Sequence, residues 1–171
     1  MKNIISVKNL SIGFHSQKNK SNVVNSISFD IPKGKTVALV GESGSGKTIT
    51  ALSILKLLTY PPAYHDSGEI IYKDKNLLNI SNKEIQKIRG NNITTIFQEP
   101  MSSLNPLHTI EKQINEILMV HSSISYSEAS KKTQDLLKSV GLDEISNRLK
   151  SYSYELSGGQ RQRVMIAMSI A

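Results

Sequence analysis

Apolar and polar residues alternate along much of the first hundred positions, in short runs separated by turns. Segments 4–10 and 23–31 alternate regularly, which predicts two half-exposed strands joined by the polar, hairpin-like loop "HSQKNKSN". Segment 36–40, "TVALV", is apolar throughout, which is typical of a strand buried on both faces. Segments 68–72 and 92–97 have the composition of further short strands. The first part of the chain is therefore expected to build a sheet.

Helical periodicity appears after segment 36–40 and dominates the second half of the chain. A helix is expected over residues 49–58, ending before two prolines that cannot continue it. Mixed α/β character extends to about residue 97, and helical character follows over about 108–150, with no low-complexity linker between them. Two Ser-x-x-Glu pairs have the spacing of a capping box and predict helix starts. These pairs are Ser81 with Glu84 and Ser125 with Glu128.

Composition narrows the class of protein. With 171 residues, 38% of them hydrophobic and 20% charged, the chain can build the core of one domain. No apolar run reaches the roughly 18 residues of a membrane span, and the N-terminus lacks the apolar stretch of a signal peptide. The absence of cysteine excludes disulfides and Cys-based metal sites, and it fits a reducing compartment. We therefore expect a cytoplasmic location.

The formal net charge of +7 would permit a nucleic-acid partner. Lys and Arg are scattered along the chain, however, and scattered lysines usually form a solvated surface. His108 lies near two glutamates, but their helical setting favours a helix surface over a metal site. From charge and spacing we expect neither nucleic-acid binding nor a His-based metal centre.

The segment "GESGSGKT" at 41–48 matches the phosphate-binding pattern G-x-x-x-x-G-K-[ST], between an apolar run and a helix. Its glycines let the backbone approach a charged ligand, and the N–H groups at the helix start favour phosphate oxygens. The lysine would reach the β- and γ-phosphates and the threonine would offer its hydroxyl to Mg²⁺. The candidate residues are Gly41, Glu42, Ser43, Gly44, Ser45, Gly46, Lys47 and Thr48.

A second glycine motif, "LSGGQ" at 156–160, precedes another helical run. Ser157 is a candidate N-cap of that helix, and the two glycines give a phosphate access to its free N–H groups. Ser-Gly-Gly alone is common in plain loops, but together with the phosphate-binding loop the motif is specific. Its candidate nucleotide-binding residues are Ser157, Gly158, Gly159 and Gln160.

With these two motifs the sequence resembles the ATP-binding subunits of ABC transporters, over nearly the whole chain. "LSGGQ" is similar to the signature motif of that family, and Gln98 matches the glutamine of its Q-loop. Phe14, placed after the first predicted strand, matches the aromatic position that stacks on adenine. "FQEPMSSLNPLHTIEKQI" and "GQRQRVMIAM" resemble the branch that imports peptides, nickel and related compounds. Within that branch they are most similar to the microcin C/peptide importer ATPases, which carry two such domains in tandem.

The resemblance implies an α/β fold: a P-loop NTPase core of the ABC type with a helical subdomain, incomplete at the C-terminus. It implies one incomplete ATP-binding domain over 1–171, with an α/β portion (1–97 and 156–171) and a helical subdomain (about 98–155). The implied ligands are ATP and Mg²⁺, with Lys47 and Gln98 as catalytic residues and Thr48 and Gln98 at the metal. The implied function is coupling of ATP binding and hydrolysis to uptake of peptides or related compounds.

The resemblance also implies partners. These are a second ATP-binding domain, whose phosphate loop each "LSGGQ" would cap, the permease subunits and, indirectly, an extracytoplasmic substrate-binding protein. The location implied is the cytoplasmic face of a bacterial inner membrane. The family's Walker B Asp-Glu pair and switch histidine have no counterpart in the sequence, so we expect little hydrolysis by this chain alone. A non-hydrolysing nucleotide-binding fragment and an ABC-type ATPase acting on nucleic acid remain alternatives.

Overall fold

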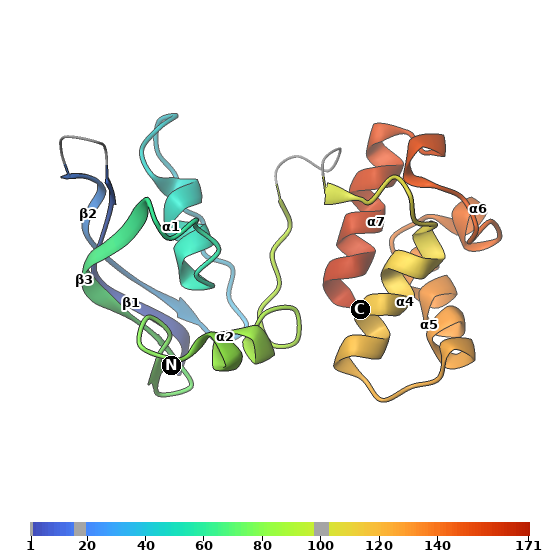
Figure 1. Cartoon of the computed structure of the whole chain (residues 1–171), viewed down its shortest axis with the longest axis horizontal. Coiled ribbons are helices and arrows are strands. Elements are labelled where there is room, and N and C mark those ends of the chain that lie inside the picture. The colour runs from blue at the N-terminus through green and yellow to red at the C-terminus, as the bar shows by residue number, and fades with distance from the viewer. Residues whose placement is uncertain (1, 16–19, 98–102) are drawn as a thin grey trace. The chain divides into compact units, whose positions relative to one another are not determined.

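The computed structural model describes residues 2–15, 20–97 and 103–171. The chain divides into two compact units, residues 1–87 and 88–171 (Figure 1). The first unit is built mainly from strands and the second from helices, as the change in sequence periodicity predicts.

The first unit contains a four-stranded antiparallel sheet in the order β2-β1-β3-β4. The two long alternating strands predicted at the N-terminus are confirmed and extend further than expected. Helix α1 is shorter than the predicted 49–58 at its C-terminal end, and α2 begins after the predicted Ser81 cap. The elements are β1 (Asn3–His15), β2 (Lys20–Pro32), α1 (Lys47–Ile54), β3 (Ala63–Tyr72), β4 (Lys75–Asn76) and α2 (Asn82–Ile88).

An irregularity in β1 changes which side chains face the core. The pairing register shifts between Val7 and Leu10, where Asn9 has a φ of 47°. Val7 and Leu10 are therefore both buried, although an uninterrupted strand would point them to opposite faces. Gly68 lies against this bulge, and a Cβ there would approach the Leu10 Cα to 2.5 Å. Only glycine fits at that position.

Two predicted strands are absent from the structure. Segment 36–40 forms no strand and is exposed, with exposed fractions of 40% at Val37, 41% at Leu39 and 91% at Val40. Segment 92–97 contains only one isolated bridge, between Arg89 and Ile93. The prediction of strands at these places was wrong for this structure. Apolar composition favours a strand only where neighbouring strands supply ladder hydrogen bonds, and the described part of the chain pairs neither segment into its sheet.

The second unit is a group of helices around one apolar cluster. Helices α4, α5 and α7 pack on one another, and α6 packs on α5. The fully buried side chains at the centre come from three of these helices and include Ile110, Ile114, Leu137 and Val164. The elements are α4 (Ile110–His121), α5 (Tyr126–Ser139), α6 (Asp143–Ser146), the 3₁₀ turn η1 (Ser153–Glu155) and α7 (Gly158–Ile170).

Both predicted capping boxes are present. The Ser125 Oγ accepts from the Glu128 N–H, and the Glu128 carboxylate accepts from the Ser125 N–H at 2.9 Å. Ser81 and Glu84 make the same pair of bonds before α2. These local hydrogen bonds depend only on residues three apart, which is why sequence spacing predicts them.

The place of α7 differs from the expectation. The resemblance assigned residues 156–171 to the α/β portion, but α7 packs against α4 and α5 in the helical unit. The reason is burial: Val164, Met165 and Ala167 of α7 belong to the apolar cluster of that unit. That the chain forms one domain stays a prediction.

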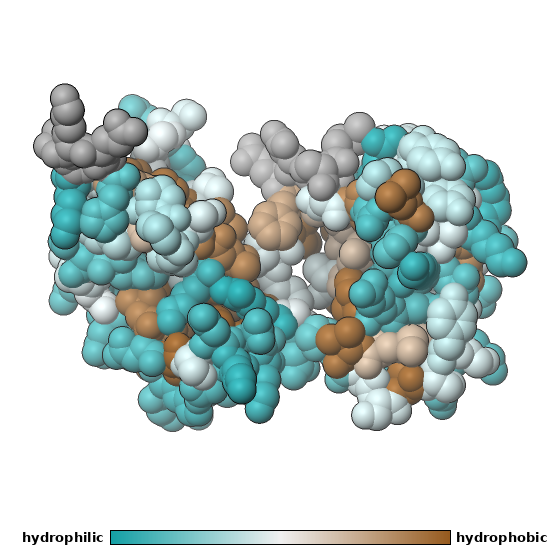
Figure 2. Space-filling view, viewed as in Figure 1, coloured by the Kyte–Doolittle hydropathy of each residue, from teal (hydrophilic) through white to brown (hydrophobic). Residues whose placement is uncertain are grey.

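Apolar side chains are also exposed on the surface. Figure 2 shows such surface, in brown, among hydrophilic residues on one face of the molecule. Across the described ranges, no helix has the length and apolar character needed to cross a membrane. The most exposed of the large hydrophobic residues are Val40, Leu107, Val120 and Tyr154.

Candidate functional site

The segment 41–48 leads directly into α1, whose first residue is Lys47. Gly46 is the N-cap of the helix and adopts a left-handed conformation with φ 86°. As a glycine it has no side chain to cap the helix, and α1 shows no side-chain cap bond. The N–H groups of the first turn therefore remain available to a negatively charged ligand.

Gly46 also lies close to β2. A Cβ at this position would approach Cγ2 of Val24 to 2.9 Å and the Val23 carbonyl oxygen to 3.3 Å. The positive φ and the close packing both require glycine, so the turn before α1 holds a fixed shape against the sheet. This explains the second glycine of the G-x-x-x-x-G pattern.

The side chain of Lys47 folds back into the loop that precedes it. Its ammonium donates to the carbonyl oxygens of Gly41 at 2.8 Å and Glu42 at 2.6 Å, and to the Ser45 Oγ at 3.3 Å. Three donors are the full capacity of an ammonium group. The loop thus wraps around one positive charge and holds it beside the helix start.

Thr48 is exposed at the start of α1, so its hydroxyl is accessible from solvent. A hydroxyl oxygen is a suitable ligand for a hard cation such as Mg²⁺. Among the residues with described positions, no group of three or more His, Cys, Asp or Glu side chains could hold a metal ion.

The predicted N-cap of the second motif is confirmed. The Ser157 Oγ accepts from the Gln160 N–H at 3.2 Å, and the Gln160 Oε1 accepts from the Ser157 N–H at 2.8 Å. Gln160 was expected as a nucleotide contact, but its side chain completes a capping box. The Ser-x-x-Gln spacing carries this signal, which sequence reasoning recognised only in the two Ser-x-x-Glu pairs.

Gly158 and Gly159, which lie between Ser157 and Gln160, have open surroundings. A Cβ at Gly158 or Gly159 would meet no atom within 4 Å, and neither residue has a positive φ. Their lack of a side chain is therefore explained neither by backbone conformation nor by packing within the described structure. It leaves room for a ligand to reach the first N–H groups of α7.

Arg161 is a residue of this region that sequence reasoning missed. Its Nε donates to the carbonyl oxygens of Ser153 at 2.7 Å and Leu156 at 3.1 Å. The guanidinium thus holds the turn η1 against the first turn of α7. No sequence pattern identifies such a contact, because it depends on the fold of residues eight positions apart.

Two further residues were predicted for the site, Phe14 and Gln98, and neither belongs to the two glycine motifs. Phe14 lies within β1, not after it, and pairs with Ser21 of β2 and Ala63 of β3. The strand continues past the predicted end because both neighbouring strands pair with it there. Gln98 lies outside the described residues.

The two glycine motifs belong to different units. Segment 41–48 lies in unit 1–87, and segment 156–160 lies in unit 88–171.

Comparison with known proteins identifies the family. Residues 24–171 match the family described as "ABC transporter". The chain is 56% identical over 168 residues to the peptidoglycan transport ATP-binding protein YejF of Agrobacterium fabrum. It is 44% identical over 168 residues to the oligopeptide transport ATP-binding protein OppD of Bacillus subtilis. Each alignment covers 98% of this chain but only 31% and 47% of those proteins.

A solved structure agrees in fold. The ATP-binding cassette MJ0796, in a dimeric post-hydrolysis state bound to ADP and Pi, matches with a TM-score of 0.84 and 27% identity. The match covers 98% of this chain and 69% of that one. The expected P-loop cassette fold and the resemblance to peptide-importer ATPases are both confirmed. The chain belongs to the ABC transporter family and corresponds to part of an ABC ATP-binding domain.

Proposed function

We propose that the chain binds ATP at segment 41–48 and contributes to the ATPase that drives uptake of peptides or related compounds. The observation that carries this proposal is the ammonium of Lys47, enclosed by three oxygen atoms of the loop beside the start of α1. A fixed positive charge next to free helix N–H groups is suited to a polyphosphate. The transport names of the relatives supply the substrate class.

On binding ATP, Lys47 would exchange its hydrogen bonds within the loop for bonds to the β- and γ-phosphate oxygens. It would then stabilise the charge that develops there during phosphoryl transfer. Catalysis of this kind depends mainly on positioning and electrostatic stabilisation. The loop N–H groups would orient the phosphates, since the shape of the turn at Gly46 is fixed against β2. Phe14, half-buried in β1, would contact the adenine.

Thr48 and Gln98 are the residues that would hold Mg²⁺ together with the nucleotide. The accessible hydroxyl of Thr48 at the helix start fits this role. When bound, the ion neutralises phosphate charge. Gln98 belongs to the proposal by its sequence position alone.

The capped start of α7 would serve a second nucleotide site. Ser157 and Gln160 fix the first turn, and the open space at Gly158 and Gly159 lets a γ-phosphate approach the backbone. That phosphate would be held by the loop of a second ATP-binding domain. The dimeric state of the MJ0796 cassette supports this arrangement.

The partners of the full protein follow from the same family. We infer permease subunits, a substrate-binding protein that delivers the peptide, and attachment to the inner face of the cell membrane. The basis is the transport function named for the relatives, of whose length this chain spans about a third to a half.

The substitution Lys47→Ala tests the proposal. Loss of a charge-assisted hydrogen-bond donor costs about 1.5–3 kcal/mol, so the Kd for ATP should rise about 10- to 100-fold. Binding can be measured by isothermal titration with ATP, with and without Mg²⁺. Lys35→Ala is the matched control, because it removes the same charge from an exposed position outside segment 41–48. Equal ATP affinity in both variants would contradict the assignment.

A further inference from the structure

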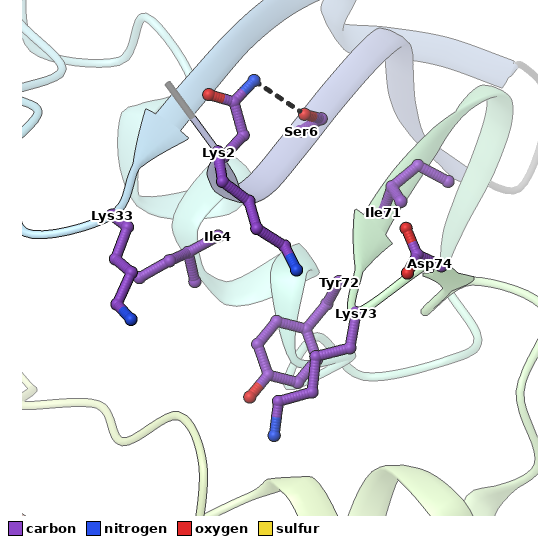
Figure 3. Close-up of a pocket in the computed structure, with 9 residues that line it drawn as sticks. Lys2, Ile4, Ser6, Lys33, Ile71, Tyr72, Lys73 and Asp74 are labelled. Carbon is purple, nitrogen blue, oxygen red and sulfur yellow. Dashed lines mark hydrogen bonds between the residues drawn. The ribbon is translucent and has the colours of Figure 1, made fainter.

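A hollow of about 580 Å³ lies in unit 1–87, away from the phosphate loop. Its walls come from the start of β1, the residue that follows β2, and the turn between β3 and β4. Figure 3 shows side chains from these three places around it, including Lys2, Lys33 and Lys73. The volume lies within the range of about 300–1,000 Å³ found for small-molecule sites.

The charges around the hollow are mainly positive. Three lysines line it, and Asp74 is its one acidic residue. Within the described residues, the only ion pair shorter than 4.0 Å joins Lys75 to Glu84. No carboxylate of the described residues therefore lies within that distance of the Lys2, Lys33 or Lys73 ammonium. Like charges that line one hollow repel one another, and a bound anion would reduce this repulsion.

Backbone pairing links the three places that carry the lysines, because Tyr72, which precedes Lys73, pairs with Ile5 of β1. The Lys33 N–H donates to the Lys2 carbonyl oxygen at 3.1 Å, which joins the end of β2 to the start of β1. The ammonium of Lys73 lies 5.2 Å from the centre of the Tyr72 ring, a cation–π distance. Tyr72 is itself 7% exposed, so this ring is a fixed support.

The turn that carries Lys73 has an unfavourable backbone conformation. Lys73 and Asp74 have φ angles of 47° and 62°, and neither is glycine. A left-handed backbone conformation is unfavourable for residues other than glycine. Hairpin turns of this length usually use Asn-Gly, which would avoid the cost. This turn instead contains Lys73 and Asp74, and both residues line the hollow.

We propose that this hollow binds a small organic phosphate. The phosphate group would lie among the ammonium groups of Lys2, Lys33 and Lys73. Its uncharged part would contact Ile4, Ile71 and the Tyr72 ring, which also line the hollow. A phosphate on a soluble metabolite and a phosphate in a lipid headgroup share this chemistry.

Titration of the ¹⁵N-labelled chain with glycerol 3-phosphate tests the proposal, because amide shifts report each site separately. Saturable shifts at Ser6, Tyr72 and Asp74 are expected. Shifts confined to residues 41–48 would mean that the probe binds only the phosphate loop and would overturn the proposal. Failure of ATP binding at that loop would leave the shifts at Tyr72 unaffected, so the two proposals are tested independently.

Replacement of Lys2, Lys33 and Lys73 by Gln should raise the Kd for glycerol 3-phosphate at least about tenfold, because charge-assisted hydrogen bonds are lost. The matched control replaces Lys8, Lys83 and Lys87, which are exposed in the same unit but do not line the hollow. If the triple variant does not fold, Lys73→Gln alone should still weaken binding several-fold. Equal Kd values for the Lys73→Gln variant and the unchanged chain would overturn the proposal.

Vesicles distinguish the two sources of phosphate. Phosphatidylcholine vesicles with 20 mol% phosphatidylglycerol (roughly the anionic content that attracts basic surfaces) would be sedimented with the chain. Co-sedimentation that the triple variant loses and the control retains indicates a lipid headgroup. Shifts with glycerol 3-phosphate but no co-sedimentation indicate a soluble organic phosphate. If the unchanged chain shows neither amide shifts nor co-sedimentation, the proposal is contradicted.

Discussion

Ser157 and Gln160 close the first turn of α7 through two reciprocal hydrogen bonds. Ser157→Ala removes the oxygen that accepts from the Gln160 N–H, and loss of an N-cap costs about 1 kcal/mol. We expect the free energy of unfolding to fall by about that amount, measured by urea denaturation. Ser157→Gly should cost only a few tenths of a kcal/mol, since glycine is a tolerated N-cap. An equal loss in both variants would show that the cap is not responsible.

His65 in β3 gives the chain a pH-dependent stability. Burial lowers the pKa of His65 below its ordinary value of 6.5, and the positive charge of Lys56 lowers it further. The unfolded chain therefore binds a proton more readily than the folded chain. The contribution of His65 is complete above about pH 6.5 and is lost as the pH falls towards the folded pKa.

The corresponding measurement compares the free energy of unfolding at pH 7.5 and pH 5.5. We expect a decrease towards low pH that is smaller in His65→Gln, because glutamine does not titrate. A His65→Gln chain with the same pH dependence as the original would contradict the prediction. In the unchanged folded chain, the pKa of His65 can be followed through its imidazole proton signals in NMR spectra.

Helices α4 and α5 are joined by a buried polar pair within an apolar cluster. The Thr133 Oγ1 donates to the Asn115 Oδ1 at 2.6 Å, and both residues are at most 1% exposed. Among the described residues, Asn115 Nδ2 is the one buried side-chain polar atom without a hydrogen-bond partner. The pair already contains an unsatisfied donor, so further loss of bonding should be costly.

Thr133→Val keeps the side-chain shape but removes the hydroxyl that donates to Asn115. We expect a loss of about 1–3 kcal/mol in the free energy of unfolding, because the amide oxygen becomes unsatisfied as well. Addition of Asn115→Leu should recover stability, since both partners are then apolar. Urea denaturation of the single and double variants measures this. A double variant less stable than Thr133→Val would contradict the explanation.

At the scale of elements, local hydrogen bonds decided which predictions succeeded. The helix starts at Ser81 and Ser125 follow from residues three apart, so the sequence pattern identifies them. Segment 36–40 has the composition of a buried strand but lies exposed. A strand needs partners from elsewhere in the chain, and one segment's composition does not reveal which partners it will have.

At the scale of the whole molecule, each unit has apolar residues of its own at its centre. Leu137 is fully buried in the helical unit, and Leu107 of the same unit is 82% exposed. Leu137→Ala should lower the free energy of unfolding by about 2–5 kcal/mol through lost burial and the cavity left behind. Leu107→Ala is the control and should change it by less than about 0.5 kcal/mol. Helical circular dichroism during urea unfolding measures both, and similar losses would contradict this account of the core.

Residue types at short, fixed spacings were enough to predict the local features. They predicted the N-cap at Ser157 and the two capping boxes, which are present. The assignment of segment 41–48 as a phosphate-binding loop rests on the same kind of spacing and stays a prediction. The sequence motifs also identified the family, which the comparisons confirm. Three other features became visible only in the folded chain: the oxygen atoms that contact Lys47, the helices that pack against α7, and the hollow lined by Lys2, Lys33 and Lys73. Contacts between distant residues form when strands and helices pack, and neither periodicity nor motif spacing contains that information.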